Sequence, residues 1–153
     1  GWTLPQSCAT PDTIARTVLN IEGESFMPNM LIIDDNAEFK TMISCYFTDL
    51  GYKVELADNG REGLAKARTC KPDIILLDVM MPDIGGIEVL KELQTSDETS
   101  AVPVIVITGT YFDSNMSELF KQESNCKYFL SKTTELADVE KKIDSILKKK
   151  DSR

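Results

Sequence analysis

Short, uninterrupted apolar runs alternate along most of the chain with segments whose apolar residues recur every three or four positions. Uninterrupted aliphatic runs are typical of strands buried on both faces, and the longer spacing is typical of amphipathic helices. The predicted strands lie at 30–33, 52–57, 73–78, 102–108 and 127–130. The predicted helices lie at 37–51, 59–69, 86–95, 114–123 and 136–147.

Regular alternation of strands and helices predicts an α/β fold with a parallel sheet covered on both faces. The most apolar strands begin near Met30, Ile74 and Val102, so we expect them at the centre of the sheet. The more polar strands, at Lys53 and Lys127, are expected nearer the edges. Ligands of such sheets bind outside the carboxyl ends of the strands, where the strand order reverses. The loops that follow the strands are therefore the place to look for chemistry.

Composition narrows the class of protein further. A chain of 153 residues, 42% hydrophobic and 27% charged, suffices for one domain with a substantial core. The longest apolar runs are too short to span a membrane, and the N-terminus lacks the pattern of a signal peptide. We therefore expect a cytoplasmic protein without membrane contact.

Charge and residue usage exclude several functions. A net charge of −8 argues against nucleic-acid contact, and the absence of histidine excludes Ser/His/Asp catalysis, the usual zinc enzymes and a phosphohistidine on this chain. The four cysteines are unevenly spaced and form no C-x-x-C pair. A disulfide framework or a zinc site is therefore not expected, and small buried thiols are.

Polar residues follow four of the predicted strands. Asp34 and Asp35 end the first strand, Asp78 the third, Thr108 the fourth and Lys132 the fifth. Each alone has an ordinary explanation, since aspartate often caps a helix. Together they indicate a site, because the carboxyl ends of parallel strands meet at one edge of the sheet.

These residue types favour phosphoryl chemistry at a metal. Three adjacent carboxylates cannot all stay ionised without a cation, and oxygen-only ligands favour magnesium. The ammonium group of Lys132 and the hydroxyl of Thr108 could bind phosphoryl oxygens. One carboxylate could then act as a nucleophile. Asp78 is the best candidate, because it ends the most apolar strand between the acidic pair and the threonine.

Four segments, "LIIDDN", "IILLDVMMPDIGGIEVL", "VIVITGT" and "YFLSK", resemble the motifs of response-regulator receiver domains, in the same order. The resemblance implies a flavodoxin-like fold, a (βα)5 three-layer sandwich with a five-stranded parallel sheet of order 2-1-3-4-5. It divides the chain into an arm, linker or remnant of a preceding domain at 1–28, a receiver domain at 29–150 and a tail at 151–153.

The resemblance also implies roles for the acidic residues. Asp78 is expected to be the phosphoacceptor and a ligand of Mg²⁺, for which Mn²⁺ or Ca²⁺ could substitute. Asp35 would bind the metal directly, Asp34 mainly through water, and Met80 through its backbone carbonyl.

The remaining roles concern phosphoryl binding and switching. Lys132 would bind one phosphoryl oxygen and Thr108 another, and Phe129 would turn inward in response. Met80 and Thr110 flank the approach of a hydrolytic water, so they are expected to tune the lifetime of the phosphoryl group.

The implied function is phosphorelay signal transduction. A partner histidine kinase or histidine phosphotransfer protein would supply the phosphoryl group, and the face of helix 4, strand 5 and helix 5 would switch. That face would contact a downstream target or output domain, and a homodimer could form through it. The domain would catalyse only its own phosphorylation and dephosphorylation, and so would not be an enzyme in the usual sense.

Other interpretations remain. The chain could be the receiver fragment of a larger hybrid sensor histidine kinase or multidomain regulator, or a pseudo-receiver that binds partners without phosphorylation. A magnesium-dependent phosphatase that works through an aspartyl phosphate would generally need a second acid two residues after Asp78. Met80 stands at that position, so general acid catalysis has no obvious agent. Flavin binding would need a phosphate-cradling loop in place of "DDNAEF".

Two local features carry further expectations. Many receivers have proline after the lysine, whereas Thr133 follows Lys132 here, so that peptide bond is expected to be either trans with a shifted loop or a costly cis bond. Before the match, the segment 10–23 has the signature of a helix, with Thr10 as its cap and Pro11 in its first turn.

Overall fold

The computed structural model describes residues 18–19, 25–79, 81, 83–109 and 114–151. The strands of the main sheet are β3 (Asn29–Ile33), β4 (Lys53–Ala57), β5 (Ile74–Asp78), β6 (Val104–Thr108) and β7 (Cys126–Ser131). The helices are α1 (Ala37–Asp49), α2 (Gly60–Cys70), α3 (Gly86–Gln94), α4 (Ser114–Lys121) and α5 (Leu136–Asp151). Two short strands, β1 (Val18–Leu19) and β2 (Ser25–Phe26), precede the sheet.

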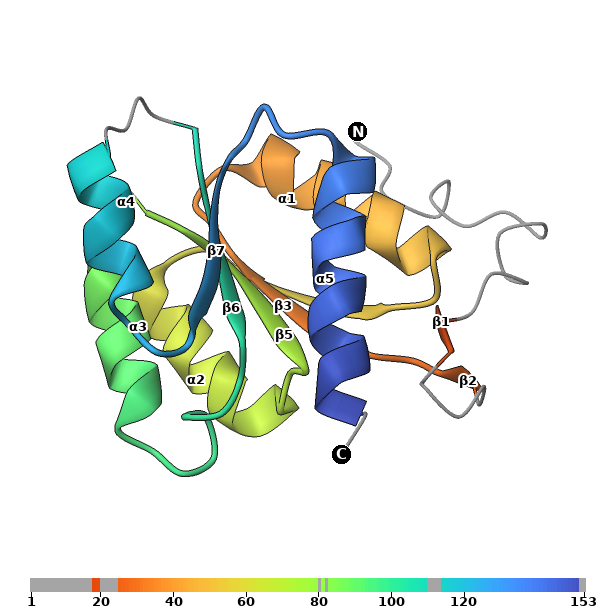
Figure 1. Ribbon diagram of the computed structural model, residues 1–153, viewed down its shortest axis with the longest axis horizontal. Helices are drawn as coiled ribbons and strands as arrows, with labels where there is room; N and C mark the ends of the chain where they lie inside the picture. Colours follow the sequence, from red (N-terminus) through yellow and green to blue (C-terminus); the bar gives the residue numbers. More distant parts are fainter. Residues whose placement is uncertain (1–17, 20–24, 80, 82, 110–113, 152–153) are drawn as a thin grey trace.

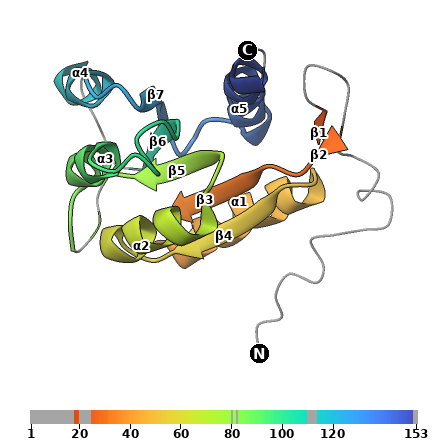
Figure 2. The same ribbon diagram turned by 90° about the horizontal axis from the view of Figure 1, so that it is seen from below.

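The five main strands form one parallel sheet in the order β4-β3-β5-β6-β7. Counted from β3, this is the predicted order 2-1-3-4-5, and the prediction of a flavodoxin-like fold is confirmed. The three most apolar strands are central, and the two polar ones form the edges. In Figure 1, α2, α3 and α4 lie on one side of the sheet and α1 and α5 on the other, and Figure 2 shows the same layers from below.

Two hydrophobic cores lie on the two faces of the sheet. Leu31 and Ile33 of β3 point into the core under α2, α3 and α4, whereas Met30 and Ile32 point into the core under α1 and α5. Successive side chains of a strand face opposite sides, so a strand between two cores must be apolar at every position. This requirement explains the uninterrupted aliphatic runs of the central strands.

Local signals set the ends of the first two helices. The side chain of Asn36 accepts a hydrogen bond from the Phe39 amide at the start of α1, and Asn59 accepts one from the Glu62 amide at the start of α2. Gly51, just after α1, has a φ of 99°, which favours glycine and confirms the predicted stop.

One face of α1 packs on the core under α1 and α5. Ile43 and Phe47 are buried there, whereas Met42 is 45% exposed. Lys40 is only 5% exposed, although a lysine is rarely buried without a partner. The burial of Lys40 therefore depends on a partner from another part of the chain, Asp58.

Two expectations are wrong where the structure describes them. Val18 and Leu19, placed in a helix by the sequence, form strand β1 and pair in antiparallel fashion with Phe26 and Ser25. The other residues of the predicted helix, 10–17 and 20–23, lie outside the described residues. The pairing partner lies beyond the predicted helix, so the local pattern could not show it. Cys45 is disulfide-bonded, whereas Cys70 and Cys126 have free thiols, because spacing along a chain does not determine which cysteines meet.

Candidate functional site

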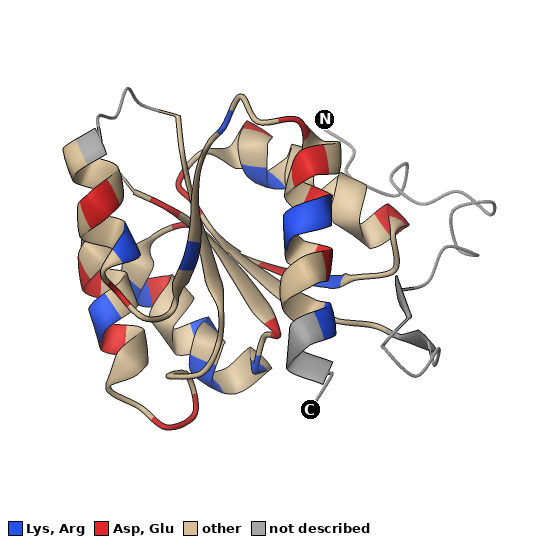
Figure 3. Ribbon diagram, in the orientation of Figure 1, with Lys and Arg blue, Asp and Glu red and all other residues tan. Residues whose placement is uncertain are grey.

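Three carboxylates converge at the carboxyl ends of β3 and β5. One oxygen from each of Asp34, Asp35 and Asp78 lies within 4.8 Å of the others. Asp34 is 1% exposed and Asp78 is 7% exposed, whereas Asp35 lies at the surface. Figure 3 shows acidic positions at these strand ends, with a basic position in the β7–α5 connection nearby. The predicted meeting of the acidic residues at this edge of the sheet is therefore observed.

Lys132 supplies the positive charge of the cluster. Its ammonium nitrogen lies 2.8 Å from Asp34 Oδ2 and 3.9 Å from Asp78 Oδ1. The same nitrogen lies 4.5 Å from the centre of the Phe39 ring, and the Lys132 amide donates to the Thr108 carbonyl. A Cβ atom at Gly109 would come within 3.1 Å of the Lys132 side chain. Glycine at this position therefore leaves room for the lysine to reach the acids.

The pKa of the Asp78 carboxyl group lies above its ordinary value. Burial, and then the negative charge of Asp34, raise the pKa of Asp78 from 3.8 to about 6, despite the opposing effect of Lys132. One lysine is thus insufficient to stabilise the buried carboxylates as fully as water would. A divalent cation among them would complete the neutralisation.

Asp34 is oriented by its own loop. The Asn36 amide donates to Asp34 Oδ1 at 2.8 Å, while the Asp34 amide donates to the Ala57 carbonyl of β4. These bonds turn the carboxylate of Asp34 toward Lys132 and fix the loop against the neighbouring strand.

Thr108 and Phe129 lie on the strands predicted for them, Thr108 on β6 next to the strand of Asp78 and Phe129 on the edge strand β7. Thr108 is 1% exposed at the end of β6, paired in register with Ser131 of β7. The Phe129 ring is buried against Phe120 of α4, with the ring centres 5.2 Å apart. The ring already lies inward in this structure, and its response to phosphorylation stays a prediction.

Three further predictions concern the loops around the site. Met80 and Thr110 lie outside the described residues, so the structure does not test their roles. The Lys132–Thr133 peptide bond is trans, which excludes the costly cis alternative. The amide and hydroxyl of Thr133 both contact the Ser131 hydroxyl, at 3.0 and 2.7 Å.

The donor set fits a hard divalent cation. The cluster offers carboxylate oxygens without nitrogen or sulfur, and one acid is open to solvent while two are buried. Such a partly open oxygen site suits Mg²⁺, which keeps several waters when it binds to proteins. Over the described residues, this is the single group of three or more acids with that geometry.

Two polar features near the site were not predicted. Lys40 forms an ion pair with Asp58, and Asp83 accepts hydrogen bonds from the amides of Gly60 and Arg61. Of the contacts around these residues, the sequence indicates only the one between Asn59 and Glu62, whose spacing is typical of a helix start. The other contacts join residues about 20 positions apart, for which no local pattern exists.

The chain belongs to the response regulator receiver domain family, whose model matches residues 30–144. Receiver domains are signalling domains of two-component systems, so phosphorelay signalling is the general function of this chain. None of the described helices combines the length and hydropathy required to span a membrane.

Individual relatives agree with this assignment. Protein PilH of Pseudomonas aeruginosa is 31% identical over 121 residues, which make up 79% of this chain and 98% of that protein. The transcriptional regulatory protein PhoP of Bacillus subtilis, concerned with alkaline phosphatase synthesis, is also 31% identical, but the match covers only 48% of its length. The crystallised chemotaxis response regulator CheY4 of Vibrio cholerae superposes with a TM-score of 0.73 at 29% identity, covering 80% of this chain and all of that one.

Proposed function

We propose that Asp78 accepts a phosphoryl group from a phosphohistidine on a partner kinase or phosphotransfer protein, and that Mg²⁺ is required. The observation that carries the proposal is the burial of Asp78 beside Asp34 and Lys132 at the end of a central strand. Burying two carboxylates at one point is costly, and ordinary packing gives no reason for it.

In the proposed reaction, an Asp78 oxygen attacks the phosphorus of the phosphohistidine. A P–O bond forms and the P–N bond breaks, so the electron pair leaves with the imidazole, which takes up a proton. The product is an acyl phosphate on Asp78. Attack requires the ionised carboxylate, and the raised pKa of about 6 still leaves Asp78 mostly ionised at pH 7.5.

Asp34, Asp35 and Asp78, with the backbone carbonyl of Met80, would bind the Mg²⁺ ion. When bound, such an ion neutralises charge on the transferring phosphoryl group. Mn²⁺, or Ca²⁺, could substitute for it because both also prefer oxygen ligands.

Lys132 would exchange part of its contact with the acids for a phosphoryl oxygen. Charge-assisted hydrogen bonds of this kind are short and strong. Thr108 would donate to another phosphoryl oxygen, and the change would reach Phe129 through the adjacent strand β7. We infer that the face of α4, β7 and α5 transmits this change to a downstream protein, by a shift between pre-existing conformations.

The proposal is tested by intact mass after incubation with phosphoramidate and Mg²⁺. We expect one added phosphoryl group in the wild type, and none in Asp78→Asn or in the presence of EDTA. Asp97→Asn, which removes an exposed acid elsewhere, should be modified like the wild type.

A wild type that gains no phosphoryl group from phosphoramidate or from a phosphorylated phosphotransfer protein would contradict the proposal. If Mg²⁺ binding were also absent, a pseudo-receiver that only binds partners would replace it.

A further inference from the structure

The N-terminus of α2 contacts Asp83, five residues after Asp78. Asp58, just before this N-terminus, pairs with Lys40 of α1, the helix that follows Asp34 and Asp35. The first four amides of a helix have no acceptor within the helix. In α2, the third and fourth of these amides belong to Glu62 and Gly63. The Glu62 amide donates to the Asn59 side chain, and the Gly63 amide donates to the Asn59 carbonyl. The first two amides are bound from outside the helix, by Asp83.

Asp83 belongs to the connection that follows Asp78. Its Oδ1 accepts from the Gly60 amide at 3.0 Å and its Oδ2 from the Arg61 amide at 2.8 Å. Desolvation acts to raise the pKa of Asp83, but hydrogen bonds from Arg61, Ile84 and Gly60 together hold that pKa below its ordinary value. The carboxylate is also favoured by the positive end of the helix dipole.

The packing around Gly60 supports the same contact. A Cβ atom at Gly60 would lie 2.5 Å from Cγ1 of Ile84, the residue after Asp83. Gly86, where α3 begins, would likewise bring a Cβ within 3.2 Å of the Asp78 carbonyl oxygen. Ile84 therefore packs closely against the start of α2, and Gly86 against the end of β5.

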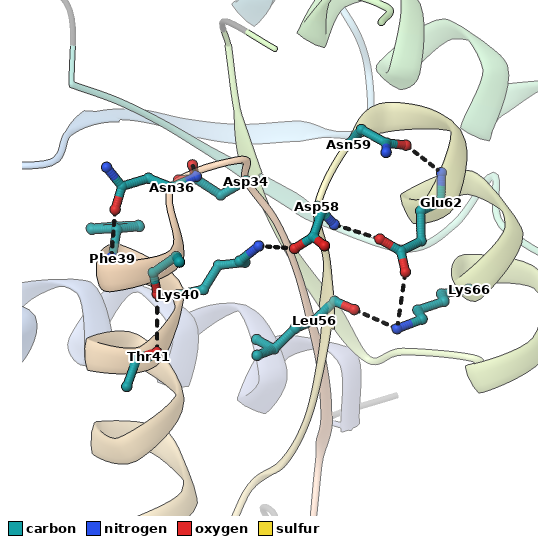
Figure 4. A network of polar contacts seen from close by, with 11 residues as sticks. Asp34, Asn36, Phe39, Lys40, Thr41, Leu56, Asp58, Asn59, Glu62 and Lys66 are labelled. Atoms are coloured by element: carbon teal, nitrogen blue, oxygen red, sulfur yellow. Dashed lines mark hydrogen bonds and ion pairs between the residues drawn. The ribbon is translucent and has the colours of Figure 1, made fainter. Parts of the chain in front are cut away.

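The other side of the α2 N-terminus is tied to α1. Lys40, 5% exposed in the first turns of α1, forms an ion pair with Asp58, which directly precedes Asn59 (Figure 4). The Asp58 amide donates to Glu62 Oε1 at 2.6 Å. The Lys40 amide donates to the carbonyl of Asn36, one residue after Asp35. This tie therefore reaches the loop that carries the other two acids.

Through these contacts the start of α2 links Asp83, which follows Asp78, to α1, which follows Asp34 and Asp35. Asp34 and Asp78 repel each other when ionised, so without a rigid support their loops would tend to separate before a cation arrives. A site whose ligands are already in place binds more tightly, because less ordering is required on binding.

We propose that Asp83 and the Lys40–Asp58 pair are positioning residues, which act through the α2 N-terminus to keep Asp78 at the spacing from Asp34 and Asp35 that a divalent cation requires. This inference rests on the proposed function, since it assumes that the three acids bind a metal. It concerns residues that touch neither the metal nor the phosphoryl group.

The test is a titration of the full chain with Mn²⁺, followed by electron paramagnetic resonance, for the wild type, Asp83→Ala and Asp58→Asn. We expect each variant to bind Mn²⁺ about tenfold more weakly, at the low end of what loss of an outer-shell partner costs a metal site. Asp83→Asn keeps one of the two acceptor oxygens, so its affinity should fall between those of the wild type and Asp83→Ala. Asp97→Ala removes the same charge from an exposed position after α3, outside the contacts described above, and should bind like the wild type.

Urea unfolding of the same variants separates positioning from a purely structural cap. Unchanged Mn²⁺ affinity in Asp83→Ala and Asp58→Asn, with or without a loss of stability, would overturn the inference and leave the proposed function intact. A wild type that binds no Mn²⁺ would overturn both.

Discussion

The two ends of the parallel sheet bury polar groups in opposite ways. At the amino end, the Asn125 side chain donates to the Leu90 carbonyl and accepts from Gln94, and the Thr99 hydroxyl donates to the Leu93 carbonyl. At the carboxyl end, Asp34 and Asp78 share the single ammonium group of Lys132. The neutral groups form hydrogen bonds with one another, whereas the two carboxylates have only one nearby positive charge between them.

This difference separates stability from function within one fold. Buried neutral groups that are hydrogen-bonded to each other stabilise the packing of α3 against the start of β7. Buried like charges have the opposite effect, and strain of this kind is concentrated at functional sites. The amino end should therefore behave as a support, and the carboxyl end as a place that gains stability when a cation binds.

The largest expected effect is that of Lys132→Met in metal-free buffer at pH 7.5. Removing the cation leaves two buried carboxylates, so the free energy of unfolding should fall by about 2–4 kcal/mol, below the top of the range for buried pairs because Lys132 is partly exposed. Urea unfolding measures the change. The loss should shrink at pH 5, where Asp78 is protonated because its pKa is about 6.

The control for Lys132→Met is Lys91→Met, which breaks a more exposed pair with Glu123. That variant should lose about 1 kcal/mol or less at either pH. An equal loss for the two lysines would contradict the contrast between the ends of the sheet.

At the amino end, Asn125→Ala should lower the free energy of unfolding by about 2 kcal/mol, because it removes two buried hydrogen bonds. The Leu90 carbonyl and the Gln94 side-chain amide lose Asn125 but keep their bond to each other, and the amide also keeps its bond to Glu123. The loss should be the same at pH 5 and pH 7.5, since both groups are neutral. Ser124→Ala, which removes an exposed bond to Gln94, is the matched control and should cost about 0.5 kcal/mol.

Asp78→Asn is expected to raise the free energy of unfolding in metal-free buffer, by less than Lys132→Met or Asn125→Ala lowers it. Because the folded state raises the pKa of Asp78 from 3.8 to about 6, the folded state binds the proton more tightly, and ionisation lowers stability as the pH rises between these values. The metal-free variant should be more stable than the wild type by about 1–2 kcal/mol at pH 7.5. The gain should vanish below about pH 4, where the group is protonated in both states.

Thermal unfolding of the wild type and Asp78→Asn at pH 7.5 and pH 4 measures this gain. Asp35→Asn should stabilise less, because Asp35 is exposed. A variant less stable than the wild type at pH 7.5 without metal would show that the buried charge carries no cost.

The sequence predicted the sheet and the acidic cluster because both depend on simple rules. Uninterrupted apolar runs mark central strands, and the ends of parallel strands meet at one edge, so the meeting of Asp34, Asp78 and Lys132 followed from their positions alone. The burial of Asp34 and the pKa of Asp78 could not follow, since they depend on distances between side chains.

The sequence failed where a partner lies far along the chain. Lys40 is buried because Asp58 meets it, and Asp83 caps a helix that begins more than 20 residues earlier. Val18 is in a strand because Phe26 pairs with it. In each case the local pattern was compatible with another structure, and a tertiary contact decided.

The most direct test of the account is to locate the phosphoryl group within the cluster. After phosphorylation with phosphoramidate and Mg²⁺, borohydride reduction converts an aspartyl phosphate to homoserine, which peptide mass spectrometry can place. We predict homoserine at position 78 and unchanged aspartate at positions 34 and 35. Homoserine at position 34 or 35, or at no position in a protein that binds Mg²⁺, would contradict the assignment of Asp78 as the phosphoacceptor.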